Sequence, residues 1–358
     1  ASVAATTLST TGAATFSGAV QIANGSYAAP AIAFASDTDT GITRGGTNTL
    51  GFVSGGALRF YTDPNSALAT ISAGTSNLTL GVNAGNSIIA GGNYNVLVGD
   101  EAGTAITTGD DNAAVGYGAL SANTTGIRNT TVGSGSLTSN DTGSYNTAVG
   151  QAALNGNTTG TYNTAVGRAA GAAVTTGTEN TLIGGLAGDS ITTGIGNVAV
   201  GYLSGEAITS GNNNVAVGNV ALESCTTASN NIAIGVAALR EITTATDNVA
   251  VGSYALGSST TGSNNTAVGD SAGIDLTTGT INTLIGSASG SNLTVGNSNV
   301  AIGYNALLTD TAGDRNVAIG VGSLQSQNFT STTDSYNIGI GYAAGSNVTT
   351  GTNNTLIG

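Results

Sequence analysis

The segment Asn146-Thr-Ala-Val-Gly-Gln-Ala-Ala-Leu-Asn-Gly-Asn-Thr-Thr-Gly-Thr-Tyr162 decides the fold, because close copies of it fill most of the chain. Each copy opens with Asn-x-x-(Val/Ile/Leu)-Gly, and we number a copy from this Asn as position 1. The spacing between successive copies is constant, except for a slightly longer step after Asn77 and a clearly longer one after Asn316. A short period held over so much of a chain indicates one structural unit stacked on copies of itself.

Within one copy, β-branched residues at positions 2 and 4 alternate with a small residue at position 3, which is typical of a short strand. Gly at position 5 ends the strand, and Thr-Thr-Gly near positions 13 to 15 predicts a turn before the next Asn. The density of Gly, Thr, Asn and Ser opposes helix. The sequence therefore predicts an all-β fold in which residues 77–358 form a β-solenoid of 17 coils, each of about 17 residues.

The Asn at position 1 recurs in every copy, and two interpretations compete. In one the Asn row is a ligand-binding stripe; in the other each amide stacks on the next coil and satisfies backbone groups that water cannot reach. Because buried polar groups are paired, we favour the structural ladder. Its members are Asn77, Asn95, Asn112, Asn129, Asn146, Asn163, Asn180, Asn197, Asn214, Asn231, Asn248, Asn265, Asn282, Asn299, Asn316, Asn337 and Asn354.

Large aliphatic residues exchange between three positions of the repeat, which indicates a shared interior. Coils with Gly at position 9, such as Gly171, place an aliphatic at position 12, here Val174. Coils with Leu at position 9, such as Leu154, place a small or polar residue at position 12, here Asn157. Leu at position 3 occurs, in complete coils, only where position 9 is Gly. Close packing requires such volume compensation, so positions 3, 9 and 12 are predicted to face one core.

The composition excludes several classes of function. The 358 residues include no His, Met or Trp, six Arg are the only basic residues, and the net charge is −13. Scattered Arg cannot neutralise a phosphate backbone, so no nucleic-acid partner is expected. Cys225, the single cysteine, lies at position 12 and is expected to substitute for a core residue. No apolar run is long enough for a membrane span, so no membrane insertion is expected.

The residues before the repeats differ in composition. Residues 1–26 alternate loosely at Ala14, Phe16, Val20 and Ile22, which predicts one strand or fibre-shaft segment. Residues 27–76 predict a small β-meander or β-prism module followed by a connector. Near the other end, the 21-residue coil that starts at Asn316 must keep its inner register, so its extra residues should bulge outward near Gln327, Asn328 and Phe329. Phe329 is then a candidate surface contact, or alternatively a plug over its own coil.

We expect no catalytic, cofactor or metal site, and no enzymatic activity. Without His or Lys, the remaining catalytic option is a carboxylate pair such as Asp110/Asp111, Asp100/Glu101 or Asp37/Asp39, and each is better explained as a solvated turn. The segment Asp37-Thr-Asp39-Thr-Gly41 lacks the later Glu of a calcium loop. Thr pairs such as Thr107/Thr108 and Thr124/Thr125 raise an ice-binding alternative, which needs two flat Thr columns facing solvent.

Two resemblances bear on the function. Thr10-Thr-Gly-Ala-Ala-Thr-Phe-Ser-Gly-Ala-Val20, with Pro30 to Ile42 and Gly55-Gly-Ala-Leu-Arg59, resembles modules of bacteriophage tail fibres. The repeats resemble those of phage fibres that end in a self-cleaving chaperone domain, and also the heads of trimeric autotransporter adhesins. Both families are trimeric, and the adhesin heads are left-handed β-rolls, which is what the resemblance implies here. The coil is longer than the usual adhesin-head repeat, and no coiled-coil stalk or membrane anchor is visible.

These observations lead to an expected function. A single coil offers a thin apolar strip, so a homotrimer that shares the strip is expected. Three chains would form a rod of a phage tail fibre in the virion tail, bound to other tail proteins. The rod would hold away from the particle a tip that lies outside this segment and binds a host-surface receptor, a polysaccharide or a protein, for host attachment. The alternatives are a bacterial surface adhesin of the autotransporter type and, less favoured, a polysaccharide-cleaving tailspike or an ice-binding solenoid. Because Gly358 is the fifth position of a coil, we expect the natural chain to continue.

Overall fold

The computed structural model describes residues 22–34, 36–46, 49–62, 68–70 and 74–358. Its contacts divide the chain into two compact units, Ala1–Ile71 and Ser72–Gly358. Of the segment 1–26 that was expected to form a strand, residues 1–21 lie outside the described residues, and residues 22–26 are not in a strand. Every described element is a strand, and no helix occurs among these residues. The all-β prediction is confirmed for this part of the chain.

The first unit contains a small antiparallel sheet. Its strands follow in chain order, β1-β2-β3-β4-β5, so it is a meander. The bounds are β1 (Ile32–Phe34), β2 (Asp37–Gly46), β3 (Thr49–Ser54), β4 (Ala57–Thr62) and β5 (Leu68–Thr70). Because β5 pairs with β4, the sheet extends into the stretch that was expected to be a connector.

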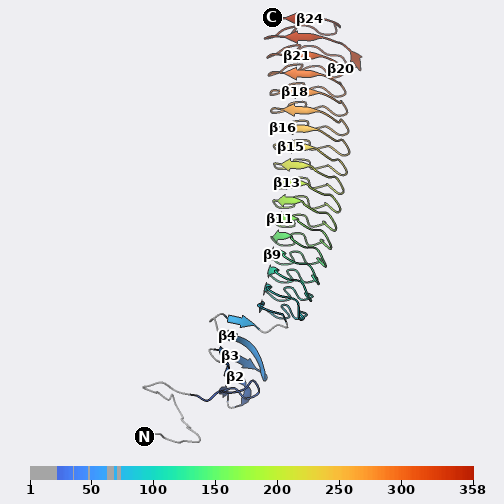
Figure 1. The fold of residues 1–358 in the computed structure, drawn as a ribbon. Coiled ribbons are helices and arrows are strands. Elements are labelled where there is room, and N and C mark those ends of the chain that lie inside the picture. The colour runs from blue at the N-terminus through green and yellow to red at the C-terminus, as the bar shows by residue number, and fades with distance from the viewer. Residues whose placement is uncertain (1–21, 35, 47–48, 63–67, 71–73) are drawn as a thin grey trace, which may run out of the picture. The chain divides into compact units, whose positions relative to one another are not determined.

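The second unit is a parallel β-solenoid of about 16 turns, in which each coil contributes one three-residue strand to a single sheet (Figure 1). Within residues 74–358 each strand pairs in parallel with the strand of the next coil, and equivalent residues lie opposite each other, as Thr147 does with Thr164. The strands are β6 (Leu78–Leu80), β7 (Val96–Val98), β8 (Ala113–Val115), β9 (Thr130–Val132), β10 (Thr147–Val149), β11 (Thr164–Val166), β12 (Thr181–Ile183), β13 (Val198–Val200), β14 (Val215–Val217), β15 (Ile232–Ile234), β16 (Val249–Val251), β17 (Thr266–Val268), β18 (Thr283–Ile285), β19 (Val300–Ile302), β21 (Val317–Ile319), β23 (Ile338–Ile340) and β24 (Thr355–Ile357).

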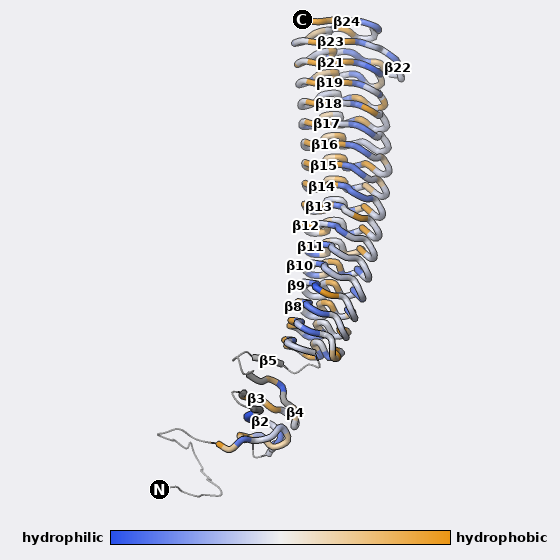
Figure 2. The backbone as a smooth tube through the Cα atoms, in the orientation of Figure 1, coloured by the Kyte–Doolittle hydropathy of each residue, from blue (hydrophilic) through white to orange (hydrophobic). Residues whose placement is uncertain are grey.

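The core lies inside the coils of one chain. Leu154 and Asn157 of one coil and Val174 of the next are all fully buried, which confirms that positions 9 and 12 face one interior. The volume exchange is also visible: a Cβ on Gly171 would lie 2.6 Å from Leu182 Cδ1 and 2.9 Å from Leu154 Cδ2. The pattern did not identify position 8, where Ala153 and its equivalents are buried too. In Figure 2 the apolar colour recurs at the same places in successive coils.

A closed interior changes the argument for a trimer. The prediction from the sequence is that three chains share a thin apolar strip. Instead, Leu97, Leu154 and Leu182 are already inaccessible within a single chain, because each side chain is covered by the coils above and below it. A second chain is therefore not needed to close the core, and the reason for any association must lie on the outer surface.

Left-handed corners bend the coil at four places. In the coil that begins at Asn146, φ is +135° at Gly150, +56° at Ala152, +49° at Leu154 and +59° at Tyr162. Only position 5 is Gly in every coil, because φ near +135° is accessible to glycine alone. At position 9 the conformation favours Gly, so each Leu there adopts a strained backbone to fill the core.

Candidate functional site

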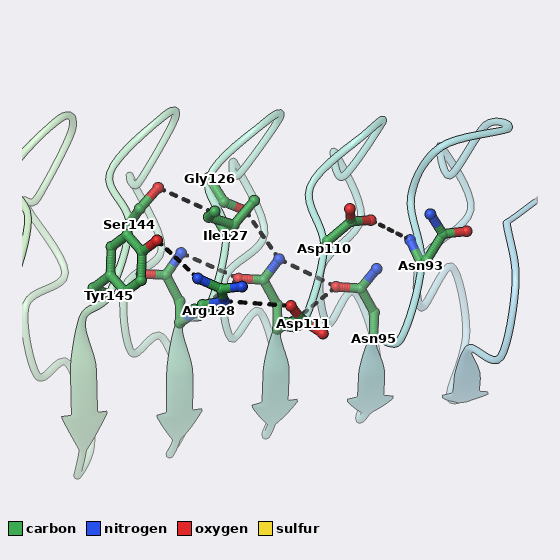
Figure 3. A network of polar contacts seen from close by, with 11 residues as sticks. Asn93, Asn95, Asp110, Asp111, Gly126, Ile127, Arg128, Ser144 and Tyr145 are labelled. Carbon is green, nitrogen blue, oxygen red and sulfur yellow. Dashed lines mark hydrogen bonds and ion pairs between the residues drawn. The ribbon is translucent and has the colours of Figure 1, made fainter.

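The Asn column is an internal hydrogen-bond ladder. From Asn95 to Asn337 these side chains are at most 1% exposed. Asn180, for example, donates its backbone N–H and its Nδ2 to Asn163 Oδ1, both at 3.0 Å, and donates Nδ2 to Gly194 O at 2.9 Å. Its own Oδ1 accepts the backbone N–H of Asn197 at 3.0 Å. Figure 3 shows the same contacts near Asn95. The column is thus enclosed, and no ligand can reach it as the coils stand.

Removing one amide should therefore cost stability. In Asn180→Ala, the backbone N–H of Asn197 and the carbonyl of Gly194 lose buried partners, and each unmet group costs about 1–3 kcal/mol. We expect a total loss of roughly 3 kcal/mol or more in the free energy of unfolding, measured by chemical denaturation. Asn219→Ala is the matched control, because Asn219 lies exposed at position 6, outside the column. An equal loss in both variants would contradict the structural role of the column.

A second, shorter ladder occupies position 12. Asn140 donates Nδ2 to Asn123 Oδ1 at 2.8 Å, and Asn157 donates Nδ2 to Asn140 Oδ1 at 2.6 Å. The ladder ends where Val174 follows, and Asn157 Oδ1 then has no partner among the described residues. Cys225, at the same position, is fully buried, and burial raises the pKa of its thiol to about 12. It substitutes for a core residue, as expected.

The 21-residue coil keeps its register but folds differently from the prediction. Val317 pairs with Ile338, so the extra residues do not shift the sheet. Gln327 is fully buried and Phe329 is only 8% exposed. The fully buried Asp310 holds both: its carboxylate accepts Gln327 Nε2 at 2.6 Å and the Phe329 N–H at 2.9 Å.

Of the three residues expected in the outward bulge, only Asn328 is exposed, and the bulge continues through residues 330–332, next to the short pair β20 (Gly313–Asp314) and β22 (Thr333–Asp334). In Figure 1 β20 lies on the edge of the stack away from the sheet. The prediction that Phe329 is a surface contact is wrong. Its side chain is buried over its own coil, and we do not propose it as a contact.

The carboxylate pairs form separate surface contacts. Asp110 accepts the N–H of Asn93 at 2.6 Å, while Asp111 pairs with Arg128 at 3.4 Å, so the two side chains bond to different partners (Figure 3). Arg128 also lies over the Tyr145 ring, 5.5 Å from its centroid. Asp100 accepts the N–H of Val82 at 3.0 Å. These acids stabilise turns between adjacent coils.

Asp37 and Asp39 lie together in β2. Their mutual hydrogen bond lowers the pKa of Asp37 and raises that of Asp39. Both groups are open to solvent, which limits the consequence for stability. In the described part of the chain, no three His, Cys, Asp or Glu residues gather closely enough to hold a metal ion.

The Thr pairs of the turn are not equivalent. At position 13 the hydroxyl is turned to the protein: Thr158 Oγ1 donates to Thr175 O, and Thr175 Oγ1 to Thr192 O, both at 3.1 Å. Only position 14, for example Thr159, is exposed. Because an ice-binding face needs two free columns, this geometry does not favour that alternative.

The feature that the sequence analysis missed is the outer face of the sheet. From β7 to β23, each strand of the solenoid sheet buries its middle residue and turns positions 2 and 4 outward, as β10 and β15 do. Val115, Val166 and Ile234, all at position 4, remain 37–40% exposed. Repetition along the stack makes position 4 a continuous apolar column beside a column of Thr and aliphatic residues at position 2. We call the surface formed by positions 2 and 4 the sheet face. The preference for Val or Ile at position 4 is the sequence signal for this surface. In the sequence it was explained by strand propensity alone.

Two further findings complete the description. Among the described residues, no helix has the length and apolar character needed to span a membrane. Comparisons of this chain with protein-family models, with curated proteins and with solved structures find no match.

Proposed function

We propose that the chain is a structural rod, in which three copies pack through their sheet faces. The observation that supports this is the sheet face itself: an apolar surface that continues over all the coils of a solenoid whose core is already closed. Exposed apolar surfaces of this extent mark interaction sites. The rise of about 4.8 Å per coil gives the rod a length of roughly 80 Å. Three copies, in place of two, is what the resemblance to trimeric fibres implies.

The size of the sheet face is sufficient for a stable interface. An exposed Val or Ile corresponds to about 60–120 Å², so a side chain left 40% exposed offers on the order of 40 Å². Over the two columns this amounts to on the order of 1,000 Å² per copy at most, which is comparable to the roughly 800 Å² that each partner contributes to a standard interface.

The distribution of charge also favours the sheet face as the interface between copies. No residue at position 2 or 4 of the sheet is charged, whereas the chain as a whole has a net charge of −13. Copies that approach through other faces would meet mutual repulsion, which an uncharged face avoids. A second copy is the natural partner, because its coils repeat with the same rise and match the face at every level.

The first test is the mass in solution. We expect light scattering to give about three times 34.3 kDa at low micromolar concentration. Val149→Asp and Val166→Asp together should shift the particle toward the monomer, since unpaired charges would enter the interface. Gln151→Asp with Arg168→Asp, at position 6 outside the sheet face, should leave the mass unchanged. A stable wild-type monomer would overturn the proposal.

We further propose that the rod belongs to a phage tail fibre in the virion tail, where it spaces a receptor-binding tip and other tail proteins without catalysis. Support comes from the resemblance of residues 10–59 and of the repeats. The alternative is a bacterial surface adhesin whose solenoid itself binds a host. Fluorescently labelled rods incubated with bacteria and with cultured animal cells separate the two. The spacer role predicts retention by neither, and retention by the animal cells favours the adhesin.

A further inference from the structure

The two outward columns of the sheet face differ in their chemistry. Position 4 is Val or Ile in every strand that the solenoid sheet contains from β7 to β24. Position 2 instead alternates in runs: four Thr, then four aliphatic residues, two Thr, three aliphatic residues and one Thr. In chain order from β9 these are Thr130, Thr147, Thr164, Thr181, Val198, Val215, Ile232, Val249, Thr266, Thr283, Val300, Val317, Ile338 and Thr355.

The Thr hydroxyls of position 2 have no partners within the described solenoid. Neither Thr147 nor Thr164 donates its Oγ1 to any group, in contrast to Thr158 and Thr175 at position 13, which bond to the next coil. Position 2 lies on the outer face of the sheet, so its hydroxyls point away from the core. Covering the sheet face would remove water from these groups, and each would then need a new partner.

An interface built on a repeating surface has an alignment problem. Sliding one copy by a whole coil would leave position 4 of each strand in almost the same surroundings, because it is Val or Ile at every level from β7 to β24. Such a slip would therefore cost little through position 4, and repeating surfaces of this kind are weakly specified in register. Position 2 is different, because its Thr and aliphatic runs have unequal lengths and match only when the copies are level.

We propose that position 2 lies beside the threefold axis and that its Thr runs align the copies, so that each Thr meets Thr at the same level of the neighbouring copies and each aliphatic meets an aliphatic. This inference rests on the proposed association through the sheet face. Threonine hydroxyls on facing strands hydrogen-bond to each other, whereas a Thr opposite Val leaves the hydroxyl without a partner.

Slipped copies would meet such mismatches repeatedly. If one copy slips by one coil, a Thr of one copy lies opposite an aliphatic residue of its neighbour at each boundary between runs. The boundaries are Ala113/Thr130, Thr181/Val198, Val249/Thr266, Thr283/Val300 and Ile338/Thr355. A slip of four coils sets the whole run Thr130–Thr181 against Val198–Val249. The position-2 pattern thus selects the level alignment over every alternative.

Disulfide trapping between copies tests the alignment. Two differently tagged chains are co-expressed, one with Thr147→Cys and one with Thr181→Cys, which are position 2 of β10 and β12. Level copies form disulfides only between chains that carry the same substitution, because two coils separate the two sites by about 9.6 Å, beyond the reach of a disulfide. Cys225 does not interfere, since it is buried and its pKa is raised to about 12.

The decisive variant keeps the one Cys in each chain and replaces the other residues among Thr130, Thr147, Thr164, Thr181, Thr266 and Thr283 by Val, which makes position 2 nearly uniform. The measured quantity is the mixed product, in which a Thr147→Cys chain is linked to a Thr181→Cys chain. We expect it to rise at least about tenfold, since even one unmet hydroxyl shifts an equilibrium by roughly that factor. The matched control replaces six position-14 residues, Thr125, Thr142, Thr159, Thr176, Thr261 and Thr278, by Val, and should give level links only.

The outcomes separate the two proposals. A monomeric wild-type particle overturns both the rod and its alignment. A trimer with no disulfide at either position shows that another face forms the interface and overturns the alignment. A trimer with abundant mixed product in the wild-type background, or with level links only in the Thr→Val variant, overturns the alignment by the Thr runs while leaving the trimeric rod intact.

Discussion

A Gly150→Ala substitution should separate the coils on both sides of it and destabilise the solenoid by more than about 3 kcal/mol. Gly150 has φ +135°, which side-chain-bearing residues rarely adopt, and an added Cβ would lie 2.6 Å from the carbonyl carbon of Gly167. That atom belongs to the backbone of the next coil, so it cannot move without disturbing the sheet. Hydrogen exchange of the Gly167 amide, which donates to Val149 O at 2.8 Å, should report the local opening.

Gly118→Ala is the matched control for this result. Gly118 also has positive φ, at +61°, but a Cβ there meets nothing within 4 Å. The equivalent residues Glu101 and Ala152 adopt the same conformation with side chains. We expect a cost of about 1 kcal/mol from the left-handed backbone alone. If both alanine variants lost the same amide protection, the close approach of coils at position 5 would not be what requires glycine.

Leu154→Asp should produce the second large effect, a loss of several kcal/mol and a strongly lowered melting temperature. Leu154 is fully buried, and its Cδ2 fills the space beside Gly171 of the next coil. An aspartate there would place an unpaired charge in the core. Gln151→Asp adds the same charge nearby at an exposed position and should change stability by less than about 0.5 kcal/mol.

Differential scanning calorimetry on Leu154→Asp and Gln151→Asp tests which of the two positions faces the core. Because the solenoid is a linear array, the Leu154 change can unfold neighbouring coils before distant ones, and a broadened transition is expected. Equal shifts for Leu154→Asp and Gln151→Asp would mean that the inner and outer faces are reversed.

The repeat itself determined most of the solenoid. Once the spacing between successive Asn residues is constant, Thr147 must stack on Thr164 and Asn146 on Asn163, and no long-range information is needed. The volume exchange between Gly171 and its neighbours could be predicted for the same reason, because close packing leaves a mark in the sequence. The preserved register across the 21-residue coil also followed, since a shift would have turned the following strand inside out.

Tertiary structure decided what depends on the path of the chain between the strands. Leu154 and Tyr162 adopt left-handed backbones that their residue types do not signal, and this bending brings Ala153 into the core and closes it within one chain. Phe329 is buried because Asp310, in the preceding coil, accepts its N–H, a contact between coils that composition cannot reveal. The period fixes which residues lie above one another, whereas the corners, and therefore which side chains meet solvent, depend on packing across several coils at once.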